Sequence, residues 1–193
     1  MITAIIMASG FSERMGSDKL FLKVNSQTLI ERTIKIVKGS KIDNIIIVYR
    51  DKRIKDIAKN QGIISIYNNN AKKGQSESIK LGIKSADERT KGFIFFVGDQ
   101  PFLSIGVINK IITEFKKRRE EIIIPLYNGK RGNPIIFPAL LKKELLLING
   151  DIGGREVIKN NLDIVNYIKI HDKYLGIDID TIEDYKKIID RGE

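Results

Sequence analysis

The 193-residue sequence has no cysteine and no tryptophan, and it has only one histidine and four prolines. Without cysteine, disulfide bonds, thiolate zinc sites and cysteine nucleophiles are excluded. No run of about eighteen apolar residues is present, so no membrane span is expected. The apolar stretch after Met1 lacks the basic segment that opens a signal peptide. These absences, with a length suited to one unit, predict a single domain over residues 1–193 in the cytoplasm.

Positive charge exceeds negative charge, since 34 lysines and arginines face 24 aspartates and glutamates, a net charge of +10. Such a surface attracts polyanions such as nucleoside triphosphates and nucleic acids. The basic residues are spread along the chain rather than gathered in one arm, so a nucleic-acid partner is not expected. A nucleotide-sensing or nucleic-acid-binding domain is the non-enzymatic alternative. It predicts nucleotide binding without pyrophosphate release, or DNA binding that weakens strongly with salt.

Short β-branched runs alternate with segments of helical periodicity, which predicts an α/β fold with a mostly parallel sheet. The predicted strands are residues 2–8, 44–49, 63–67, 92–97 and 121–126. The predicted helices between them are residues 28–38, 52–60, 75–87 and 105–118. A turn-rich segment at 128–132 predicts a hairpin with an antiparallel strand at 133–137. Further helices are predicted at 139–148, 153–161 and 181–191.

The segment after the first strand, residues 9–19, combines glycines with two cations. Gly10 and Gly16 let the backbone approach a ligand, and the N–H groups of such a loop can cradle phosphates. Arg14 and Lys19 add positive charge suited to a triphosphate. The lysine does not directly follow a glycine as in a P-loop, and the G-x-G-x-x-G spacing is absent. The segment therefore indicates phosphate binding of another kind, with an ordinary glycine-bearing loop as the alternative.

Acidic residues follow two other apolar segments. Asp99 comes after the predicted strand at 92–97, and Mg²⁺ prefers one or two carboxylates with phosphate oxygens and water. Its alternative role is to cap the following turn. Asp178 and Asp180 are two residues apart, so in a strand they point to the same side. Because Asp180 can also cap the last helix, Asp178 is predicted as the second metal ligand, and the opposite assignment stays open.

Together these segments resemble the family of molybdenum cofactor nucleotidyltransferases, most closely its cytidylyltransferase branch, over residues 5–185. Residues 7–19 are similar to the family's Leu-Ala-Ala-Gly-x-Ser-x-Arg-Met-Gly-x-x-Lys pattern, with departures at the first and third positions. Residues 98–101 are similar to its Asp-x-Pro metal motif. The other similar segments are Asn68 with Gly74 and Ser78, residues 132–134 with asparagine in place of histidine, residues 150–155 and residues 178–184.

The resemblance implies a Rossmann-like three-layer α/β/α sandwich with a mostly parallel mixed sheet, as in nucleotide-diphospho-sugar transferases. It also implies Mg²⁺ as cofactor and transfer of a nucleoside monophosphate to the phosphate of molybdopterin. The predicted catalytic residues are Lys19, Arg14 and Asp99, and the predicted metal ligands are Asp99 and Asp178. The predicted nucleotide-binding residues are Ala8, Ser9, Gly10, Ser12, Arg14, Lys19, Asn68, Gly74, Ser78 and Asp99. The predicted acceptor-binding residues are Arg131, Asn133, Asp151 and Arg155.

The choice of nucleotide within the family depends on Ser9. The guanylyltransferase branch carries glycine at this position, and a side chain there narrows the base pocket, which favours CTP over GTP. A GTP-dependent molybdenum cofactor guanylyltransferase and a sugar-phosphate nucleotidyltransferase are the enzymatic alternatives. Asp151 as a helix N-cap and Arg155 as a solvated helix residue are the alternative roles of those two side chains. The expected partners are an NTP and a molybdopterin-type acceptor, with a molybdoenzyme or its chaperone.

Overall fold

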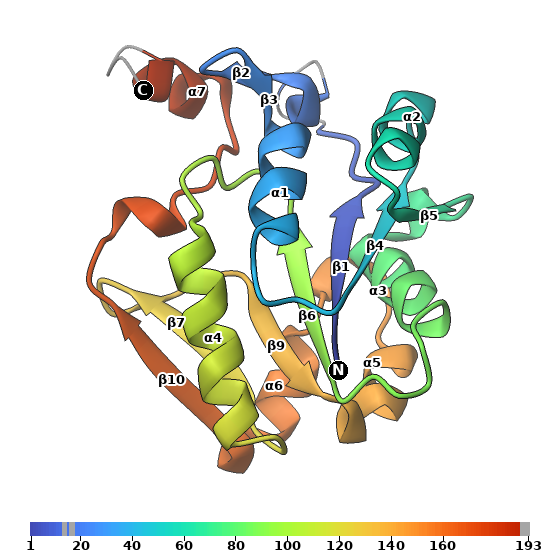
Figure 1. The fold of residues 1–193 in the computed structure, drawn as a ribbon, viewed down its shortest axis with the longest axis vertical. Coiled ribbons are helices and arrows are strands. Elements are labelled where there is room, and N and C mark those ends of the chain that lie inside the picture. Colours follow the sequence, from blue (N-terminus) through green and yellow to red (C-terminus); the bar gives the residue numbers. More distant parts are fainter. Residues whose placement is uncertain (13–14, 16–17, 190–193) are drawn as a thin grey trace.

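A computed structural model of the protein describes residues 1–12, 15 and 18–189 (Figure 1). Its strands are β1 (Ile2–Ala8), β2 (Lys23–Val24), β3 (Gln27–Thr28), β4 (Asn44–Tyr49), β5 (Ile64–Tyr67), β6 (Gly92–Val97), β7 (Ile122–Tyr127), β8 (Lys130–Arg131), β9 (Ile135–Pro138) and β10 (Val165–Ile170). The main sheet has the order β10-β7-β9-β6-β1-β4-β5, with β8 paired to β7, and β2 and β3 form a separate ribbon. The ribbon, β8 and β10 are not among the predicted strands.

The α-helices are α1 (Leu29–Lys38), α2 (Lys52–Asn60), α3 (Gln75–Lys84), α4 (Ile105–Lys117), α5 (Lys142–Leu147), α6 (Arg155–Asn160) and α7 (Ile182–Ile189). Each corresponds to a predicted helix, with ends that differ by up to three residues. Thr28 begins α1 with a capping box. Its side chain accepts a hydrogen bond from the backbone N–H of Glu31, and the side chain of Glu31 accepts one from the backbone N–H of Thr28. Within the described part of the chain, no helix has the length and apolarity needed to cross a membrane.

Strand direction divides the sheet into two parts. β1 pairs in parallel with β4 and β6, and β4 pairs in parallel with β5. β9 is antiparallel to β6 and β7, and β10 is parallel to β7. The predicted mixed sheet is therefore confirmed. The predicted antiparallel strand is also confirmed, because β9 pairs with β7. The short strand β8, which lies in the connection between them, adds a second antiparallel pairing to β7.

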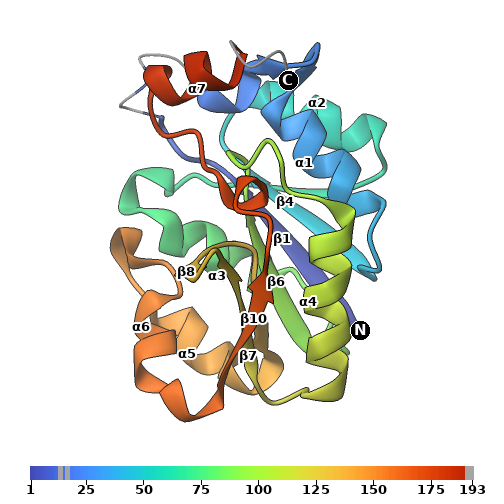
Figure 2. The same ribbon diagram turned by 90° about the vertical axis from the view of Figure 1, so that its left-hand side faces the viewer.

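Helices cover both faces of the sheet, as Figure 2 shows. On one face α1, α2 and α4 contribute to a buried core that includes Ile54 and Ile108. On the other face α3, α5 and α6 contribute to a second core that includes Ile83. Ile6 belongs to the first core and its neighbour Ile5 to the second, as side-chain alternation along a strand requires. The predicted three-layer α/β/α sandwich is confirmed.

A third, smaller core lies near the carboxyl ends of the parallel strands, where α7 and the β2–β3 ribbon are found (top of Figure 1). Val24 of the ribbon and Ile188 of α7 belong to it together with Ile179. Ile179 is fully buried (0% exposed), so this core fixes the backbone between Asp178 and Asp180. The third core therefore attaches a late segment of the chain to the edge of the sheet where the first strand ends.

Candidate active site

The register of the central strands brings distant segments to one edge of the sheet. Ala8 at the end of β1 pairs with Tyr49 of β4, and Met7 pairs with Val97 of β6. Because these strands are parallel, the residues that follow them lie beyond the same edge. The β1 loop (residues 9–18) and the turn after β6 therefore meet there.

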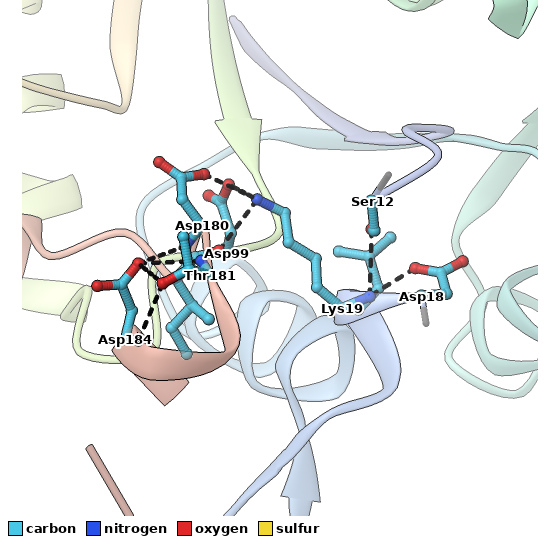
Figure 3. Close-up of polar contacts among 9 residues, drawn as sticks. Ser12, Asp18, Lys19, Asp99, Asp180, Thr181 and Asp184 are labelled. Carbon is cyan, nitrogen blue, oxygen red and sulfur yellow. Dashed lines mark hydrogen bonds and ion pairs between the residues drawn. The ribbon is translucent and has the colours of Figure 1, made fainter. Parts of the chain in front are cut away.

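Lys19 is held at this edge by three acceptors (Figure 3). Its Nζ donates to Asp99 Oδ2 at 2.6 Å, to the carbonyl oxygen of Ile179 at 3.1 Å and to Asp180 Oδ1 at 3.3 Å. Burial lowers the pKa of the Lys19 ammonium, but the charges and hydrogen bonds of Asp99 and Asp180 outweigh burial and raise the pKa above its ordinary value. Lys19 is therefore charged at neutral pH and in direct contact with a carboxylate 80 residues away.

The backbone of Lys19 is fixed by its neighbours in the β1 loop. Lys19 begins a 3₁₀ turn, Lys19–Phe21, whose N-cap Asp18 accepts from the backbone N–H of Leu20 at 3.2 Å. The N–H of Lys19 donates to Ser12 Oγ at 3.1 Å (Figure 3). Ser12, a predicted nucleotide-binding residue, thus has a structural task, which is to anchor the start of the turn that presents Lys19.

Asp99 has one oxygen that no donor reaches. Lys19 binds its Oδ2, whereas its Oδ1 is buried without a hydrogen-bond partner among the described residues. A buried acceptor without a partner is unfavourable, and a bound cation would satisfy it. Residues 1–12, 15 and 18–189 contain no group of three or more histidine or acidic side chains that could hold a metal. Mg²⁺ needs only one or two protein carboxylates, so this finding does not exclude it at Asp99.

Asp178 is a carboxylate in an unfavourable electrostatic environment. Its pKa is raised to about 6, first by desolvation of the carboxyl and then by the negative charge of Asp99, although the residue as a whole is exposed. The amide of Gln100 opposes this shift. That amide is buried, yet it makes no hydrogen bond of normal geometry to any described residue. Desolvation combined with like charge is a setting in which a carboxylate gains from a bound cation.

Asp178→Asn is expected to stabilise the metal-free protein at pH 8 and to have little effect near pH 4. A carboxyl whose pKa is raised from 3.8 to about 6 by folding holds its proton more tightly in the folded state. The folded state therefore loses stability as the pH rises through this window. The full shift corresponds to about 3 kcal/mol, and the solvent exposure of Asp178 reduces this to about 1 kcal/mol.

Denaturant unfolding in a chelating buffer at both pH values measures this difference. Asp163→Asn removes an exposed carboxylate of the same charge and serves as the matched control. A gain in the free energy of unfolding that is equal at pH 4 and pH 8, or equal in the control, would contradict the assignment.

The last helix is capped by Thr181 and Asp184, not by Asp180. Thr181 donates to Asp184 Oδ2 from both N and Oγ1 at 2.9 Å, and Asp184 N donates to Thr181 Oγ1 at 3.2 Å. The side chain of Asp180 contacts Lys19 instead (Figure 3). The prediction that Asp180 caps this helix is therefore wrong. Since Asp180 has no capping role, capping gives no reason to prefer Asp178 over Asp180 as a metal ligand. Residues 177–180 also form no strand.

Two clefts open at this edge and share a wall. The larger, of about 790 Å³, is lined by the β1 loop, the start of α3 and Asp99. The smaller, of about 280 Å³, is lined by Asn133, Arg155 and Asp178 among others. Asp99 and Asp180 line both clefts. Ligands in the two clefts would therefore approach each other at these two carboxylates.

A buried polar network joins β1, α3 and the end of β5 beside the larger cleft. The hydroxyl oxygens of Ser9 and Ser78 lie 2.6 Å apart, and Asn68 Nδ2 donates to them at 3.1 and 3.2 Å. All three residues are at most 4% exposed. Ser9, Ser78 and Gly10 line the cleft, whereas Ala8 and Asn68 lie behind its lining. The structure thus brings these predicted nucleotide-binding residues together.

The start of α3 depends on Gly74 and Asp151. Gly74 has a φ of +100°, and a Cβ there would lie 2.4 Å from the backbone of Gly150, so only glycine fits. Asp151 Oδ1 accepts from the backbone N–H of Gln75 at 2.9 Å and so caps α3 from 76 residues away. Asp151 lines the larger cleft and not the smaller one, which separates it from the other predicted acceptor-binding residues.

The remaining predicted arginines differ in outcome. Arg155 lines the smaller cleft together with Asn133. Arg131 lines neither cleft, because its guanidinium lies 5.0 Å from the ring centre of Tyr167 on β10. The structure therefore gives no support to acceptor binding by Arg131. Arg14 lies outside the described residues, so its predicted role stays a prediction.

Two other arginines, which the motifs do not include, support this edge. Arg32 of α1 donates from Nε and Nη2 to the carbonyl oxygen of Pro101, at 3.3 and 3.1 Å, and so anchors the turn after β6. Arg50 directly follows β4 and contacts the β1 loop. The position of Arg50 directly after a strand could have identified it from the sequence as a residue of this edge. No sequence signal identifies Arg32, because its contact with Pro101 depends on how α1 packs.

Residues 4–165 match the family model described as the MobA-like NTP transferase domain. A probable molybdenum cofactor guanylyltransferase of Natranaerobius thermophilus is 33% identical over 129 residues, which are 66% of this chain and 62% of that protein. The chain thus spans less than two thirds of that relative's length. The molybdenum cofactor cytidylyltransferase of Escherichia coli K12 is 28% identical over 198 residues, covering 95% of this chain and 93% of that protein.

The fold is shared with a solved protein of Mycobacterium tuberculosis H37Rv, with a TM-score of 0.86, 21% identity and 98% of both chains covered. A structure of that protein in complex with manganese gives a TM-score of 0.82 at 21% identity and the same coverage. The family match spans most of this chain and includes both Lys19 and Asp99. The chain belongs to the MobA-like NTP transferase domain family and is a nucleotidyltransferase.

Proposed function

We propose that this nucleotidyltransferase transfers CMP from CTP to the phosphate of a molybdopterin-type acceptor, with a divalent metal ion, Mg²⁺, as cofactor and pyrophosphate as second product. The observation that carries the proposal is the pair of clefts that share Asp99 and Asp180, with the Lys19 ammonium bound to both carboxylates. Transfer between two bound substrates requires their reacting atoms to come within about 3–3.5 Å, and a shared wall permits this. The names of the relatives suggest the acceptor.

The larger cleft holds the nucleotide in this proposal. Ser9 and Ser78 face the base and ribose, and Asn68 holds their two hydroxyls in place from behind. The triphosphate lies along the β1 loop with its α-phosphate at Lys19, while Arg14 binds the β- and γ-phosphates. The start of α3 at Gly74 adds the positive end of a helix dipole to the same cleft.

In the reaction, an oxygen of the acceptor's phosphate attacks the α-phosphorus of CTP. The bond from that phosphorus to the bridging oxygen of the β-phosphate breaks, and pyrophosphate leaves with the electron pair. Because the attacking phosphate is already anionic at neutral pH, no general base is needed. Lys19 stabilises the negative charge that redistributes onto the α-phosphate oxygens, which is catalysis by a preorganised donor.

Lys19 has to change partners to do this. In the structure its ammonium lies between the carboxylates of Asp99 and Asp180. A triphosphate in the larger cleft offers anionic oxygens to the same ammonium. When Lys19 moves to them, both oxygens of Asp99 become free for a cation. Nucleotide binding and metal binding would then reinforce each other.

The proposed metal ligands are Asp99 and Asp178. The buried free oxygen of Asp99 and the raised pKa of Asp178 both support a cation at this point. Bound Mg²⁺ supplies charge neutralisation at the phosphate oxygens and at the leaving pyrophosphate. The manganese in the structure of the mycobacterial protein belongs to that protein, and it favours a divalent metal here.

The smaller cleft holds the acceptor. Arg155 has a guanidinium suited to an acceptor phosphate, and the amide of Asn133 can hydrogen-bond a pterin-like ring. Molybdopterin with a molybdoenzyme or its chaperone as the receiving partner is the proposed context. A sugar phosphate is the alternative acceptor, because the chemistry at Lys19 and Asp99 is the same for both.

CTP is the proposed donor, and GTP is the alternative. Ser9 Oγ occupies a buried position between Ser78 and Asn68, so the loop residue that faces the base carries a side chain where the guanylyltransferase branch carries glycine. GTP has an observation in its favour, since the 33% identical relative is named a probable guanylyltransferase.

Pyrophosphate release with CTP, Mg²⁺ and molybdopterin is expected to be at least about tenfold faster than with GTP, a difference of about 1.4 kcal/mol. Ser9→Gly is expected to move this ratio toward GTP, because removal of the side chain widens the base pocket. Ser26→Gly, in the turn of the β2–β3 ribbon outside both clefts, is the matched control and is expected to leave the ratio unchanged. A GTP preference in the unaltered protein contradicts the donor assignment. Pyrophosphate release only with sugar phosphates contradicts the acceptor assignment. Pyrophosphate release in the absence of any acceptor contradicts the proposal as a whole.

A further inference from the structure

We propose that Arg50 is a positioning residue that joins the two ends of the β1 loop and so holds it ready for the triphosphate. The proposal rests on the function proposed above for that loop. Arg50 lines neither cleft, so it acts through the loop rather than on the ligand.

The side chain of Arg50 reaches both ends of the loop. At the entry, its Nη2 donates to the carbonyl oxygen of Gly10 at 3.5 Å, and its guanidinium lies 4.5 Å from the ring centre of Phe11. At the exit, the same Nη2 donates to Asp18 Oδ2 at 3.3 Å. The pairing of Ala8 with Tyr49 explains this reach, because it places the residue after β4 beside the loop that follows β1.

The exit contact leads directly to Lys19. Asp18 binds Arg50 through Oδ2 and caps the Lys19–Phe21 turn through Oδ1, which accepts from Leu20 N at 3.2 Å (Figure 3). Displacement of Asp18 would therefore move the first residue of that turn. The side chains of Arg50 and Asp18 are 30% and 14% exposed, so their ion pair is partly shielded from solvent and from salt.

A lysine could not replace this arginine. The planar guanidinium can stack on Phe11 while its N–H groups point to two separate acceptors, whereas an ammonium is a single point of charge. The Arg50 Nε–H is also buried without a partner among the described residues, which is unfavourable for an arginine kept only for stability. The planar guanidinium of Arg50 is therefore suited to bridging the two ends of the loop.

Arg50→Ala is expected to raise the KM and the Kd for CTP about tenfold, with a change in kcat of less than about threefold. Without the bridge Gly10 and Asp18 are no longer held together, and the bound triphosphate must order these two ends again. Once the nucleotide is bound, Lys19 is back in place, so the chemical step is nearly unchanged. Steady-state kinetics and calorimetric titration of CTP measure these constants, and circular dichroism confirms that the variants are folded.

Three further variants make the test specific. Arg50→Lys keeps the charge and is expected to behave like Arg50→Ala. Asp18→Asn keeps an acceptor for Leu20 and is expected to raise KM as well, with little further effect when combined with Arg50→Ala, because both remove the same link. Arg89→Ala removes the same charge from an 81% exposed side chain paired with Asp87, and it is expected to match the unaltered protein.

Each other outcome is decisive. An unchanged KM and Kd in Arg50→Ala, a loss confined to kcat, or full activity of Arg50→Lys overturns the positioning role. If the unaltered protein binds CTP but releases no pyrophosphate, the proposed function fails, and the Kd values still decide on Arg50. If Arg50→Ala does not fold, Arg50→Lys and Asp18→Asn carry the same test.

Discussion

Replacement of Lys19 by alanine is expected to lower kcat for pyrophosphate release at least about 100-fold, a loss of about 2.7 kcal/mol of transition-state stabilisation. The ammonium is the one described cation in contact with both carboxylates of the shared wall, so no described neighbour can replace it there. The variant is expected to fold, since it removes only the two partly exposed ion pairs of one side chain, together worth about 1–2 kcal/mol. Single-turnover release of pyrophosphate at saturating CTP and Mg²⁺ measures the effect.

The same variant is expected to bind Mn²⁺ several-fold more tightly in the absence of nucleotide. The ammonium that competes for Asp99 Oδ2 is gone, so the carboxylate no longer has to release a partner. Calorimetric titration of the nucleotide-free protein with Mn²⁺ provides this second measurement. Lys23→Ala, which removes an exposed lysine of the nearby ribbon, is the matched control for net charge.

These two effects have opposite signs, which separates a catalytic role from a structural one. A lysine that only held the edge of the sheet together would, when lost, weaken metal binding and activity alike. Near-normal turnover of Lys19→Ala refutes the role in phosphate stabilisation. If turnover falls but the Mn²⁺ affinity is unchanged, the proposed move of Lys19 from Asp99 to the triphosphate is refuted, while the catalytic role of Lys19 is retained.

The central part of the site could be predicted from the sequence because a general rule places it. In a parallel sheet the segments after neighbouring strands share an edge, so a loop after residue 8 and a turn after residue 97 must meet there. The apolar runs of β1 and β6 are clear enough to show both ends. The contact between Lys19 and Asp99 follows from these ends once β1 and β6 are neighbours, and that pairing comes from the structure.

The late part of the site could not be predicted in the same way. Thr181 and Asp180 are both acceptable N-caps by residue type, and only the bonds to Asp184 show which one caps α7. Asp151 fits a cap of the helix after it, yet it caps α3, because the close approach of Gly74 and Gly150 brings the two segments together. Such contacts depend on tertiary packing, which local patterns do not contain.

The strand β10 shows a different kind of limit. Residues 165–170 carry an alternating pattern, with Ile168 and Ile170 buried and Tyr167 and Lys169 exposed. This is the pattern of a half-covered strand, and β10 is paired only with β7 at the edge of the sheet. Continuous apolar runs, which identify the central strands, therefore do not identify this edge strand.

Asp99→Asn is expected to reduce metal-dependent turnover at least about 1000-fold and to remove Mn²⁺ binding to the nucleotide-free protein. The substitution keeps the size of the side chain and removes the charge that both the cation and Lys19 require. Binding of CTP in a chelating buffer is expected to be retained, because Lys19 keeps the backbone oxygen of Ile179 and Asp180 as partners. Turnover across a Mg²⁺ titration and calorimetry with Mn²⁺ and CTP measure these quantities.

The neighbouring carboxylates decide how this result is read. Asp178→Asn is expected to weaken Mn²⁺ binding more than Asp180→Asn, because Asp178 has no ion-pair partner among the described residues whereas Asp180 is paired with Lys19. Asp163→Asn again controls for the loss of one surface carboxylate. A Mg²⁺ titration of Asp99→Asn that matches the unaltered protein excludes Asp99 as a metal ligand. Loss of CTP binding in chelator instead shows that Asp99 acts by holding Lys19, and the cation then has to be sought at Asp178 and Asp180.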